Sequence, residues 1–591
     1  MCGICGIAST RGTVDPGRLA AMSATLVHRG PDSDGTHVDG AVGLAARRLA
    51  IIDLETGDQP ITTAEGRLAV IQNGELYNYR ELRRELERAG HRLATSSDTE
   101  VIVHLYSEHG DSFVERLRGM FAFALWDAER GRLVLARDRY GVKPLYYREA
   151  DGELEFASEL RALPRGEIDL DALDAFLALN SVPGPLTIFR HVRKLQAGHM
   201  LTWESGRSEV VRYARPAPVP AEDVRQDDEA ELVEELRARL RDSVRAHLVS
   251  DVPVGVLLSG GIDSATLASL AAEELSEPLR TFSIGFEETS FDELADARLV
   301  AERYGTEHRE LVVRPNTALL LPALAEAFDE PFADSAALPT YLAAQLAAQD
   351  VKVALSGEGG DELFGGHYAY AADLLADRAG WRQHGWKEIF SPDARAELTG
   401  LRNGFDPVGL LRARFEETEG AEPLARLQDV DLGTYLVDDL LVKTDRASMA
   451  HSLEARVPFL DTIVTNFSLG LASRHKVRGL RKKTLLRKAA TPLIPPKLLR
   501  RRKRGFAIPT AAWLRGELEH FARETLSPET LRRQGFFRPE TVTRLIDDHV
   551  AGRGDLSRQL WGLLAFTLWH ERHVERTPGP LQKPRLEALA Q

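Results

Sequence analysis

The chain has 591 residues, of which 43% are hydrophobic and 28% are charged, and its formal net charge is −14. This length exceeds what one hydrophobic core supports, so at least two domains are expected. The negative charge argues against a general nucleic-acid-binding protein. No run of 18 apolar residues predicts a membrane span, and the start MCGICGIAST lacks a secretory signal. Two cysteines form no disulfide framework, so we expect a cytoplasmic enzyme or binding protein without membrane contact.

The patterning changes along the chain. Residues 1–215 alternate short β-rich runs with turns, which favours stacked antiparallel sheets. Residues 216–228 are proline-rich and acidic, as is typical of a linker. Residues 229–575 alternate strand-like and helical patterns, which predicts a parallel sheet, and become mostly helical from about residue 410. Residues 576–591 are predicted to be a loose tail.

Cys2 follows the initiator Met1, and removal of Met1 would place a thiol and a free α-amine on one residue. An α-amine has a pKa of about 7.7–8.0 and can activate the thiol as a nucleophile. A carbonyl group that this thiol attacks would need an oxyanion hole. The alternatives are that Cys2 is a buried apolar residue or forms a redox pair with Cys5, although such a pair normally opens a helix after a strand. Cys5 itself is expected to be structural.

Further motifs follow Cys2 in a fixed order, at residues 28–32, 48–51, 73–78 and 97–100. Together they resemble the glutaminase domain of the class II, N-terminal-nucleophile amidotransferases over roughly residues 2–210. The resemblance implies an Ntn-hydrolase αββα sandwich. It also implies that the cysteine attacks the side-chain amide of glutamine, forms a glutamyl thioester and releases ammonia.

The same resemblance implies a role for each motif, with residues 28–32 left as a structural loop. Asn73 and the backbone of Gly74 would form the oxyanion hole. Arg48 would hold the α-carboxylate of glutamine, a task suited to a guanidinium fork. Glu75 and Asp98 would receive its α-ammonium group. Taken alone, Asn73 and Gly74 would instead predict a hairpin turn, and Arg48 or Asp98 a surface charge.

The segment SGGIDS at residues 259–264 lies between a strand-like run and a helical pattern that reaches Leu275. Glycines let the backbone approach a ligand, and a helix N-terminus binds an anion. The segment is not a Walker A loop, and it resembles the pyrophosphate loop of the N-type ATP pyrophosphatases, which adenylate a carboxylate or carbonyl oxygen. The carboxylate of Asp263 is suited to carry a Mg²⁺ ion bound to phosphates. The resemblance implies an ATP site that includes Ser259, Gly260, Gly261, Asp263 and Ser264.

A second loop, SGEGGDELFGG at residues 356–366, follows the strand-like run 351–355. Its three carboxylates repel one another unless a cation or a proton relieves them, and a solvated acidic turn is the alternative. The loop resembles that of the asparagine synthetases, with His367 in the place of a tyrosine. By this resemblance Glu358 would be the general base that deprotonates ammonia, and Asp361 would assist Mg²⁺ and pyrophosphate. Glu362 is expected to be structural.

The resemblance also implies an adenosine pocket lined by Leu257, Ile284, Ser356 and Gly357. Lys503, in the basic run 500–504, would face the triphosphate, and residues 483–487 would add positive charge. The alternative for the basic run is a nucleic-acid or localisation patch. Residues 329–335 and 442–461 would shape the acceptor side of the cleft.

The two halves together imply a glutamine-dependent asparagine synthetase, an AMP-forming carbon–nitrogen ligase that uses ATP and Mg²⁺. Ammonia from glutamine would pass internally to a β-aspartyl-AMP made from aspartate, giving asparagine, AMP, pyrophosphate and glutamate. One alternative is the same chemistry on a different carboxylate, such as a cell-wall peptide or a biosynthetic intermediate. Another is a catalytically silent glutamine- or nucleotide-binding protein. A homodimer is left open.

Overall fold

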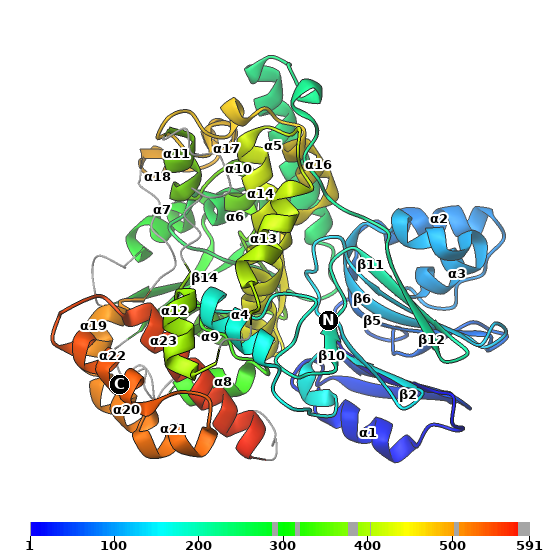
Figure 1. The fold of residues 1–591 in the computed structure, drawn as a ribbon. Helices are drawn as coiled ribbons and strands as arrows, with labels where there is room; N and C mark the ends of the chain where they lie inside the picture. The colour runs from blue at the N-terminus through cyan, green and yellow to red at the C-terminus, as the bar shows by residue number, and fades with distance from the viewer. Residues whose placement is uncertain are drawn as a thin grey trace.

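The computed structural model describes residues 2–286, 293–313, 320–375, 388–401, 404–500 and 508–576 (Figure 1). In Figure 1 the N-terminal part is rich in strands, whereas the rest of the chain surrounds one small sheet with helices. Within these residues, no helix is both long enough and apolar enough to cross a bilayer.

Two six-stranded antiparallel sheets form the N-terminal part. The first has the strand order β10 (Val192–Lys194), β8 (Tyr146–Ala150), β9 (Glu153–Ala157), β1 (Cys2–Ser9), β3 (Val42–Arg48) and β2 (Ser33–Asp39). The second has the order β12 (Arg207–Arg212), β11 (His199–Glu204), β7 (Arg132–Arg137), β6 (Gly119–Asp127), β5 (Leu68–Leu76) and β4 (Ile61–Thr62).

Apolar side chains fill the space between the two sheets. Ile4 and Leu44 of the first sheet belong to the same buried cluster as Ile71 and Leu135 of the second. The outer faces are covered by α1 (Pro16–Ala24) on the first sheet, and by α2 (Tyr79–Arg88) and α3 (Glu100–His109) on the second. This αββα arrangement confirms the predicted sandwich.

The second sheet system is parallel, as predicted. Its strand order is β15 (Glu307–Val313), β14 (Arg280–Phe286), β13 (Val254–Leu257), β16 (Val353–Leu355) and β17 (Glu454–Arg456). It is packed by α5 (Glu229–His247), α6 (Ile262–Glu274), α7 (Leu294–Tyr304) and α9 (Ala337–Ala347). The last strand, β17, lies within the region that is mostly helical, as predicted, and was not itself predicted.

The rest of the C-terminal part is a helical extension. Many of its helices begin with proline, whose fixed φ suits the first turn of a helix. They are α8 (Leu321–Ala327), α10 (Gly360–Phe364), α11 (Tyr368–Leu375), α12 (Pro392–Thr399), α13 (Pro407–Glu416), α14 (Pro423–Gly433), α15 (Leu441–Met449), α16 (Thr462–Leu469), α17 (Thr484–Ala490), α18 (Pro496–Arg500), α19 (Thr510–Arg515), α20 (Glu519–Thr525), α21 (Pro528–Gln534), α22 (Pro539–Val550) and α23 (Ser557–His570). Between α14 and α15 lies η6 (Leu436–Leu440), a turn of π-helix.

The two parts are in extensive contact. Helix α4 (Leu170–Leu179), from the N-terminal part, packs against α12 and α13, and Figure 1 shows α4 among the central helices. Residues 216–228 contain one short 3-10 turn and two isolated β-bridges, and α5 then begins at Glu229, capped by the Asp228 side chain. The domain boundaries stay a prediction.

Candidate active sites

Cys2 begins β1 and is buried, with 4% of its surface exposed. Its backbone N–H donates to Asn73 Oδ1 at 3.2 Å, and its sulfur accepts from Gln59 Nε2 at 3.7 Å. Burial raises the pKa of the Cys2 thiol. A thiol of this kind needs a neighbouring base before it can act as a nucleophile.

Cys5 belongs to a different environment. It packs in the cluster under α1, whereas Cys2 packs between the two sheets. Residues i and i+3 of a strand point to opposite faces, which explains the separation. Because the two side chains lie on opposite faces of β1, the cysteines are not placed to form the alternative redox pair, and both thiols are free.

Asn73 and Gly74 lie inside β5, opposite Ala122 and Phe121 of β6, so the alternative of a hairpin turn was wrong. The side chain of Asn73 is fully buried, and its Nδ2 has no hydrogen-bond partner among the described residues. A Cβ at Gly74 would lie 2.1 Å from the Met120 carbonyl oxygen, so no side chain fits there. A buried, unpaired donor next to Cys2 is suited to a ligand oxygen.

Glu75 and Asp98 are both buried beside Asn73. Asp98 Oδ2 accepts from Gln72 Nε2 at 3.0 Å and from the Leu76 N–H at 2.9 Å, whereas Glu75 Oε2 has no hydrogen-bond partner in the described part of the chain. Burial raises the pKa of both carboxyl groups, and Asp98 raises that of Glu75 further. A bound ammonium group would relieve both effects.

Arg48 stands opposite Cys2 in the β1–β3 pairing. Its guanidinium donates to Asp58 at 2.9 Å and to the Ile52 carbonyl oxygen at 3.0 Å. The prediction did not include Gln59, although its amide donates a hydrogen bond to the Cys2 sulfur. No motif marks Gln59, because a single glutamine in a loop has no distinguishing pattern.

A cavity of about 710 Å³ opens at the carboxyl ends of β13, β14 and β16, the edge where parallel sheets bind ligands. Every residue predicted to bind ATP and described by the structure lines it, together with Glu358 and Asp361. These are Leu257, Ser259, Gly260, Gly261, Asp263, Ser264, Ile284, Ser356 and Gly357. The predicted contact Lys503 lies outside the described residues.

The loop at residues 259–264 is held by its own serines. Ser264 Oγ accepts from the Ser259 N–H at 3.0 Å and hydrogen-bonds to Ser259 Oγ at 2.8 Å. Gly261 caps α6 and lines the cavity, so the N-terminus of this 13-residue helix opens into it. Backbone N–H groups and the helix dipole there favour a phosphate group.

Lys483 joins the loop at residues 259–264 to the loop at residues 356–366. Its Nζ lies 2.6 Å from Asp361 Oδ1 and also forms an ion pair with Asp263. Burial alone would lower the pKa of Lys483, but the two carboxylates raise it overall. The ammonium group is therefore charged and lies between the residues predicted to carry Mg²⁺.

Asp263 and Asp361 suit the predicted Mg²⁺ only when the phosphates of a nucleotide supply further ligands. Within the described residues, no group of three or more metal-binding side chains could hold an ion. Asp263 and Asp361 supply two carboxylates beside the predicted phosphate site, and Mg²⁺ is commonly held by one or two carboxylates plus substrate phosphates. The donor set thus suits Mg²⁺ that arrives with ATP.

Glu358 lies in the same cavity and is partly buried. Thr444 Oγ1 donates to its Oε1 at 3.3 Å, and Lys443 Nζ lies 4.0 Å away. Burial raises the pKa of Glu358, while Lys443 acts in the opposite direction. Lys443 also pairs with Asp334 at 3.0 Å. The prediction placed residues 442–461 on the acceptor side but did not single out Lys443 or Thr444.

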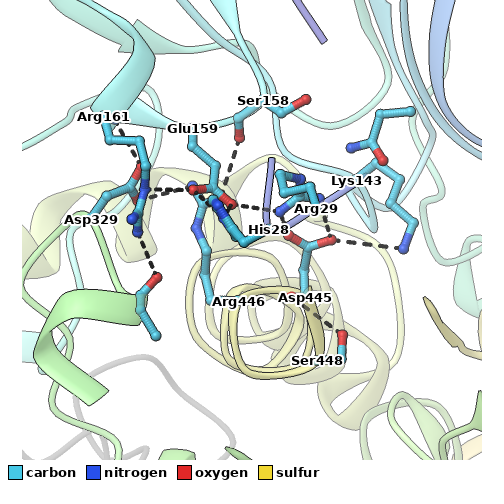
Figure 2. Close-up of polar contacts among 12 residues, drawn as sticks. His28, Arg29, Lys143, Ser158, Glu159, Arg161, Asp329, Asp445, Arg446 and Ser448 are labelled. Carbon is cyan, nitrogen blue, oxygen red and sulfur yellow. Dashed lines mark hydrogen bonds and ion pairs between the residues drawn. The ribbon is translucent and has the colours of Figure 1, made fainter. Parts of the chain in front are cut away.

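A buried charge cluster joins the two parts of the chain (Figure 2). Arg29 donates to both carboxylate oxygens of Asp445, at 2.8 and 3.0 Å, and to Glu159 at 2.8 Å. Arg446 pairs with Glu159 at 2.9 Å and with Asp329 at 3.1 Å. None of these five residues is more than 3% exposed. Loss of any one partner would leave a buried charge uncompensated, so the two parts depend on each other at this junction.

Helix α15 contacts both candidate sites within one turn, at residues 443–446. Lys443 and Thr444 contact Glu358. The third, Asp445, binds Arg29, which in turn donates to the Cys2 carbonyl oxygen at 3.3 Å. Arg29 belongs to the motif at residues 28–32, which was expected to be only a structural loop.

Comparisons with known proteins agree with this arrangement. Residues 1–214 match the glutamine amidotransferase domain family, and residues 235–571 match the asparagine synthase family. The chain is 36% identical to asparagine synthetase (glutamine-hydrolyzing) 1 of Bacillus subtilis, with 98% of each protein covered. It is 32% identical to asparagine synthetase (glutamine-hydrolyzing) 3 of the same organism, over 85% of this chain and 86% of that protein.

A third relative has a different name. The chain is 28% identical to amidase chry2 of Gibberella zeae, over 86% of this chain and 88% of that protein. The first relative is 36% identical over nearly the whole chain, and a family model matches each half. This chain therefore belongs to the glutamine-hydrolysing asparagine synthetases, within the class II N-terminal-nucleophile amidotransferases.

Proposed function

We propose that this chain hydrolyses glutamine in its N-terminal part and uses the ammonia to amidate an ATP-activated carboxylate in its C-terminal part. The observation that carries the proposal is that the motifs of both halves assemble into two separate sites, one around Cys2 and one around the 710 Å³ cavity. A cytoplasmic location and a homodimer stay predictions.

In the first half-reaction, which requires that Met1 has been removed, the α-amine of Cys2 takes the thiol proton and the thiolate attacks the side-chain amide carbon of glutamine. Asn73 Nδ2 and the Gly74 N–H stabilise the oxyanion. The carbon–nitrogen bond then breaks, ammonia leaves, and water hydrolyses the thioester to glutamate. Arg48 holds the α-carboxylate of glutamine, and Glu75 with Asp98 holds its α-ammonium group.

In the second half-reaction, the acceptor carboxylate attacks the α-phosphate of ATP and pyrophosphate leaves. The loop at residues 259–264, Lys483 and Lys503 bind the phosphates, and the pocket around Leu257, Ile284, Ser356 and Gly357 holds the adenosine. Asp263 and Asp361 would hold Mg²⁺, which supplies positive charge that neutralises the phosphates.

Ammonia then attacks the acyl-adenylate. Glu358 accepts a proton from the attacking nitrogen, because an ammonium nitrogen must lose protons to become an amide. The bond between the acyl carbon and the AMP oxygen breaks, and AMP leaves. Lys443 lies beside Glu358 and favours its ionised form before the transfer.

Aspartate is the first candidate acceptor, because the two Bacillus relatives are named asparagine synthetases. A different carboxylate is the second candidate. It is favoured by a second cavity, of about 220 Å³, which adjoins the ATP cavity and leaves room for a longer acceptor.

The proposal is tested with purified protein, amide-¹⁵N glutamine, Mg-ATP and aspartate, with products read by mass spectrometry. Labelled asparagine and AMP, both absent with Cys2→Ala, would support the whole scheme. Glutamate without labelled asparagine would leave the glutaminase half standing and exclude aspartate as the acceptor. Formation of neither product would overturn the proposal.

A further inference from the structure

Two histidines meet in the helical layer that covers the second sheet of the N-terminal part. His104 lies in the middle of α3, and His91 follows the end of α2. Their Nδ1 atoms are 3.3 Å apart, and the two ring planes are inclined by 72°. Figure 1 shows α2 and α3 on the side of the N-terminal part that faces away from the C-terminal helices. Neither histidine belongs to a motif that predicted a site.

Each of the two rings has a carboxylate beside its other nitrogen. His91 Nε2 lies 3.1 Å from Glu108 Oε2, and His104 Nε2 lies 3.6 Å from Glu100 Oε1. An ionised carboxylate only accepts hydrogen bonds, so in each ring Nε2 is the nitrogen that carries the proton. A carboxylate beside the protonated nitrogen is the usual support of a histidine that binds a metal ion through its other nitrogen.

The protons of two neutral rings do not satisfy all three of these contacts. A neutral imidazole has one N–H, which in each ring here faces the carboxylate. Both Nδ1 atoms then present lone pairs to each other across 3.3 Å. One cation between the two Nδ1 atoms would replace this repulsion by two favourable contacts. A third proton or a metal ion could be that cation.

The distance between the two nitrogens favours a metal ion. A Zn–N distance of about 2.0–2.1 Å and a tetrahedral angle place two ligand nitrogens about 3.3–3.4 Å apart. An N–H donor usually lies closer, at about 2.9–3.0 Å from an oxygen acceptor. The observed separation of 3.3 Å agrees with the metal-bound value. Imidazole is a ligand that suits zinc, copper and nickel.

The two rings are held in place by their own elements. The His91 N–H donates to the Leu86 carbonyl oxygen at 3.0 Å, which fixes the chain directly after α2. His104 belongs to α3, which packs against α2 and β5. The two side chains are 19% and 12% exposed, so water can reach them. Within the described residues, no group of three or more metal-binding side chains could hold an ion, so water would complete the coordination.

We propose that His91 and His104 bind one divalent transition-metal ion through their Nδ1 atoms, with Zn²⁺ as the first candidate. Glu108 and Glu100 are positioning residues that hold the two rings. The site differs in kind from the Mg²⁺ predicted at the ATP cavity, because nitrogen ligands suit transition metals whereas Mg²⁺ prefers oxygen. The inference does not depend on the amidation proposed above.

The ion would join the end of α2 to α3 across the loop of residues 89–99. This loop contains Asp98, which is predicted to hold glutamine. Glu100 already fixes part of the loop, because it accepts from the N–H groups of Ala94 and Thr95 at 2.6 and 2.7 Å. The metal site would therefore stabilise the segment that carries a glutamine-binding residue.

The test uses the full-length Cys2→Ala protein after treatment with EDTA, because the thiol of Cys2 could itself bind zinc. Calorimetric titration with ZnCl₂ should show one ion bound per chain. Crystals grown with ZnCl₂ should give an anomalous peak between His91 and His104. His91→Asn and His104→Asn should each weaken zinc binding at least about tenfold. Far-UV circular dichroism reports whether each variant is folded.

Glu108→Gln tests the site without removing a ligand. Loss of a carboxylate that supports a metal-binding histidine typically lowers metal affinity about 10- to 100-fold, and we expect a loss of that size. Glu108 is 47% exposed, so the change should leave the fold intact. His520→Asn, at an exposed position of α20, is the control and should not alter zinc binding.

Three results would overturn the inference. The first is equal zinc affinity in the parent protein and in both histidine variants. The second is an anomalous peak only at another place in the molecule. The third is no zinc binding, together with a Tm in EDTA that falls between pH 5 and pH 8 in the parent protein but not in His91→Asn. That result would show that the pair holds a third proton instead of a metal ion.

Discussion

The two candidate sites are built in opposite ways. Around Cys2, the main residues lie on strands or directly beside them and are buried among tightly packed side chains. Around the ATP cavity, they lie on loops that follow strand ends and surround about 710 Å³. Strands hold a small set of groups rigidly, whereas loops at a sheet edge leave room for a large ligand. The difference matches a small amide substrate in one site and a nucleotide in the other.

The charges of the two sites differ in the same way. Burial raises the pKa values of Glu75 and Asp98, so these two carboxyl groups suit a ligand that brings an ammonium group, although the Arg456 guanidinium lies 3.8 Å from Glu75. Asp263 and Asp361 already share the ammonium group of Lys483. The second site therefore suits a ligand that brings both phosphate and a metal ion, with Lys483 available to the phosphate.

Replacing the nucleophile should separate the sites most completely. For Cys2→Ala we expect glutamine-dependent amidation to fall at least about 1,000-fold, because no other group can form the thioester. Amidation with added ammonium chloride should persist, because the ATP cavity is untouched. Both rates are measured by mass spectrometry of the product. Equal loss of both activities would show that the two sites are not separable.

Glu358→Gln is the reciprocal change. We expect amidation from either nitrogen source to fall about 10²- to 10⁴-fold, the usual contribution of a general base. Acceptor-dependent exchange of labelled pyrophosphate into ATP should persist, because adenylation precedes the proton transfer. Glu302→Gln, at an exposed position of α7, is the control. Loss of the exchange together with amidation would place Glu358 in adenylation instead.

Asp445→Asn tests the cluster that joins the two sites. Removing one charge of a buried ion pair typically costs about 3–5 kcal/mol, because its partner is left uncompensated. We expect a loss of that size in the free energy of unfolding, measured by urea denaturation. Asp547→Asn removes an ion pair with Arg523 that is exposed on both sides and should cost at most about 1 kcal/mol. Similar costs for the two variants would contradict the proposed importance of the cluster.

Asn73→Ala should weaken only the first site. Loss of one oxyanion donor typically lowers kcat about 10²- to 10³-fold. The KM for glutamine should change little, because the donor acts on charge that develops in the transition state. Steady-state glutamate release gives both constants. A rise in KM with an unchanged kcat would assign Asn73 to substrate binding.

The smallest expected effect concerns stability against pH. Burial raises the pKa of Asp431 from 3.8 to about 7, and Tyr370 donates a hydrogen bond to its carboxyl group. The folded protein thus keeps a proton that the unfolded chain releases above pH 3.8, and this stabilisation is lost as the pH rises through about 7. Asp431→Asn is neutral throughout. The free energy of unfolding of Asp431→Asn minus that of the wild type should therefore rise between pH 5 and pH 8. A difference that does not change with pH would exclude Asp431 as the source of the pH dependence.

The sequence predicted the local features well. Two kinds of hydrophobic pattern distinguished antiparallel from parallel sheets, and the predicted ATP loops surround one cavity because both follow parallel strands. The contacts of Gln59, Lys443 and the pair Arg29–Asp445 were not predicted. These depend on residues far apart in the chain, up to 416 positions for Arg29 and Asp445, and no local pattern records such a contact. Strand β17 was also not predicted, because its three residues, EAR, are too few to show the alternating hydrophobic pattern of a strand.

The cluster around Arg29 and Asp445 also limits how this protein can be divided. A cut within residues 216–228 would leave each half with charged side chains that are now at most 3% exposed and paired across the junction. Each half alone would expose these charges together with the apolar surfaces around them. Exchange of halves between relatives would likewise require both members of each pair to be kept. We therefore expect the two parts to be stable only when they are kept together.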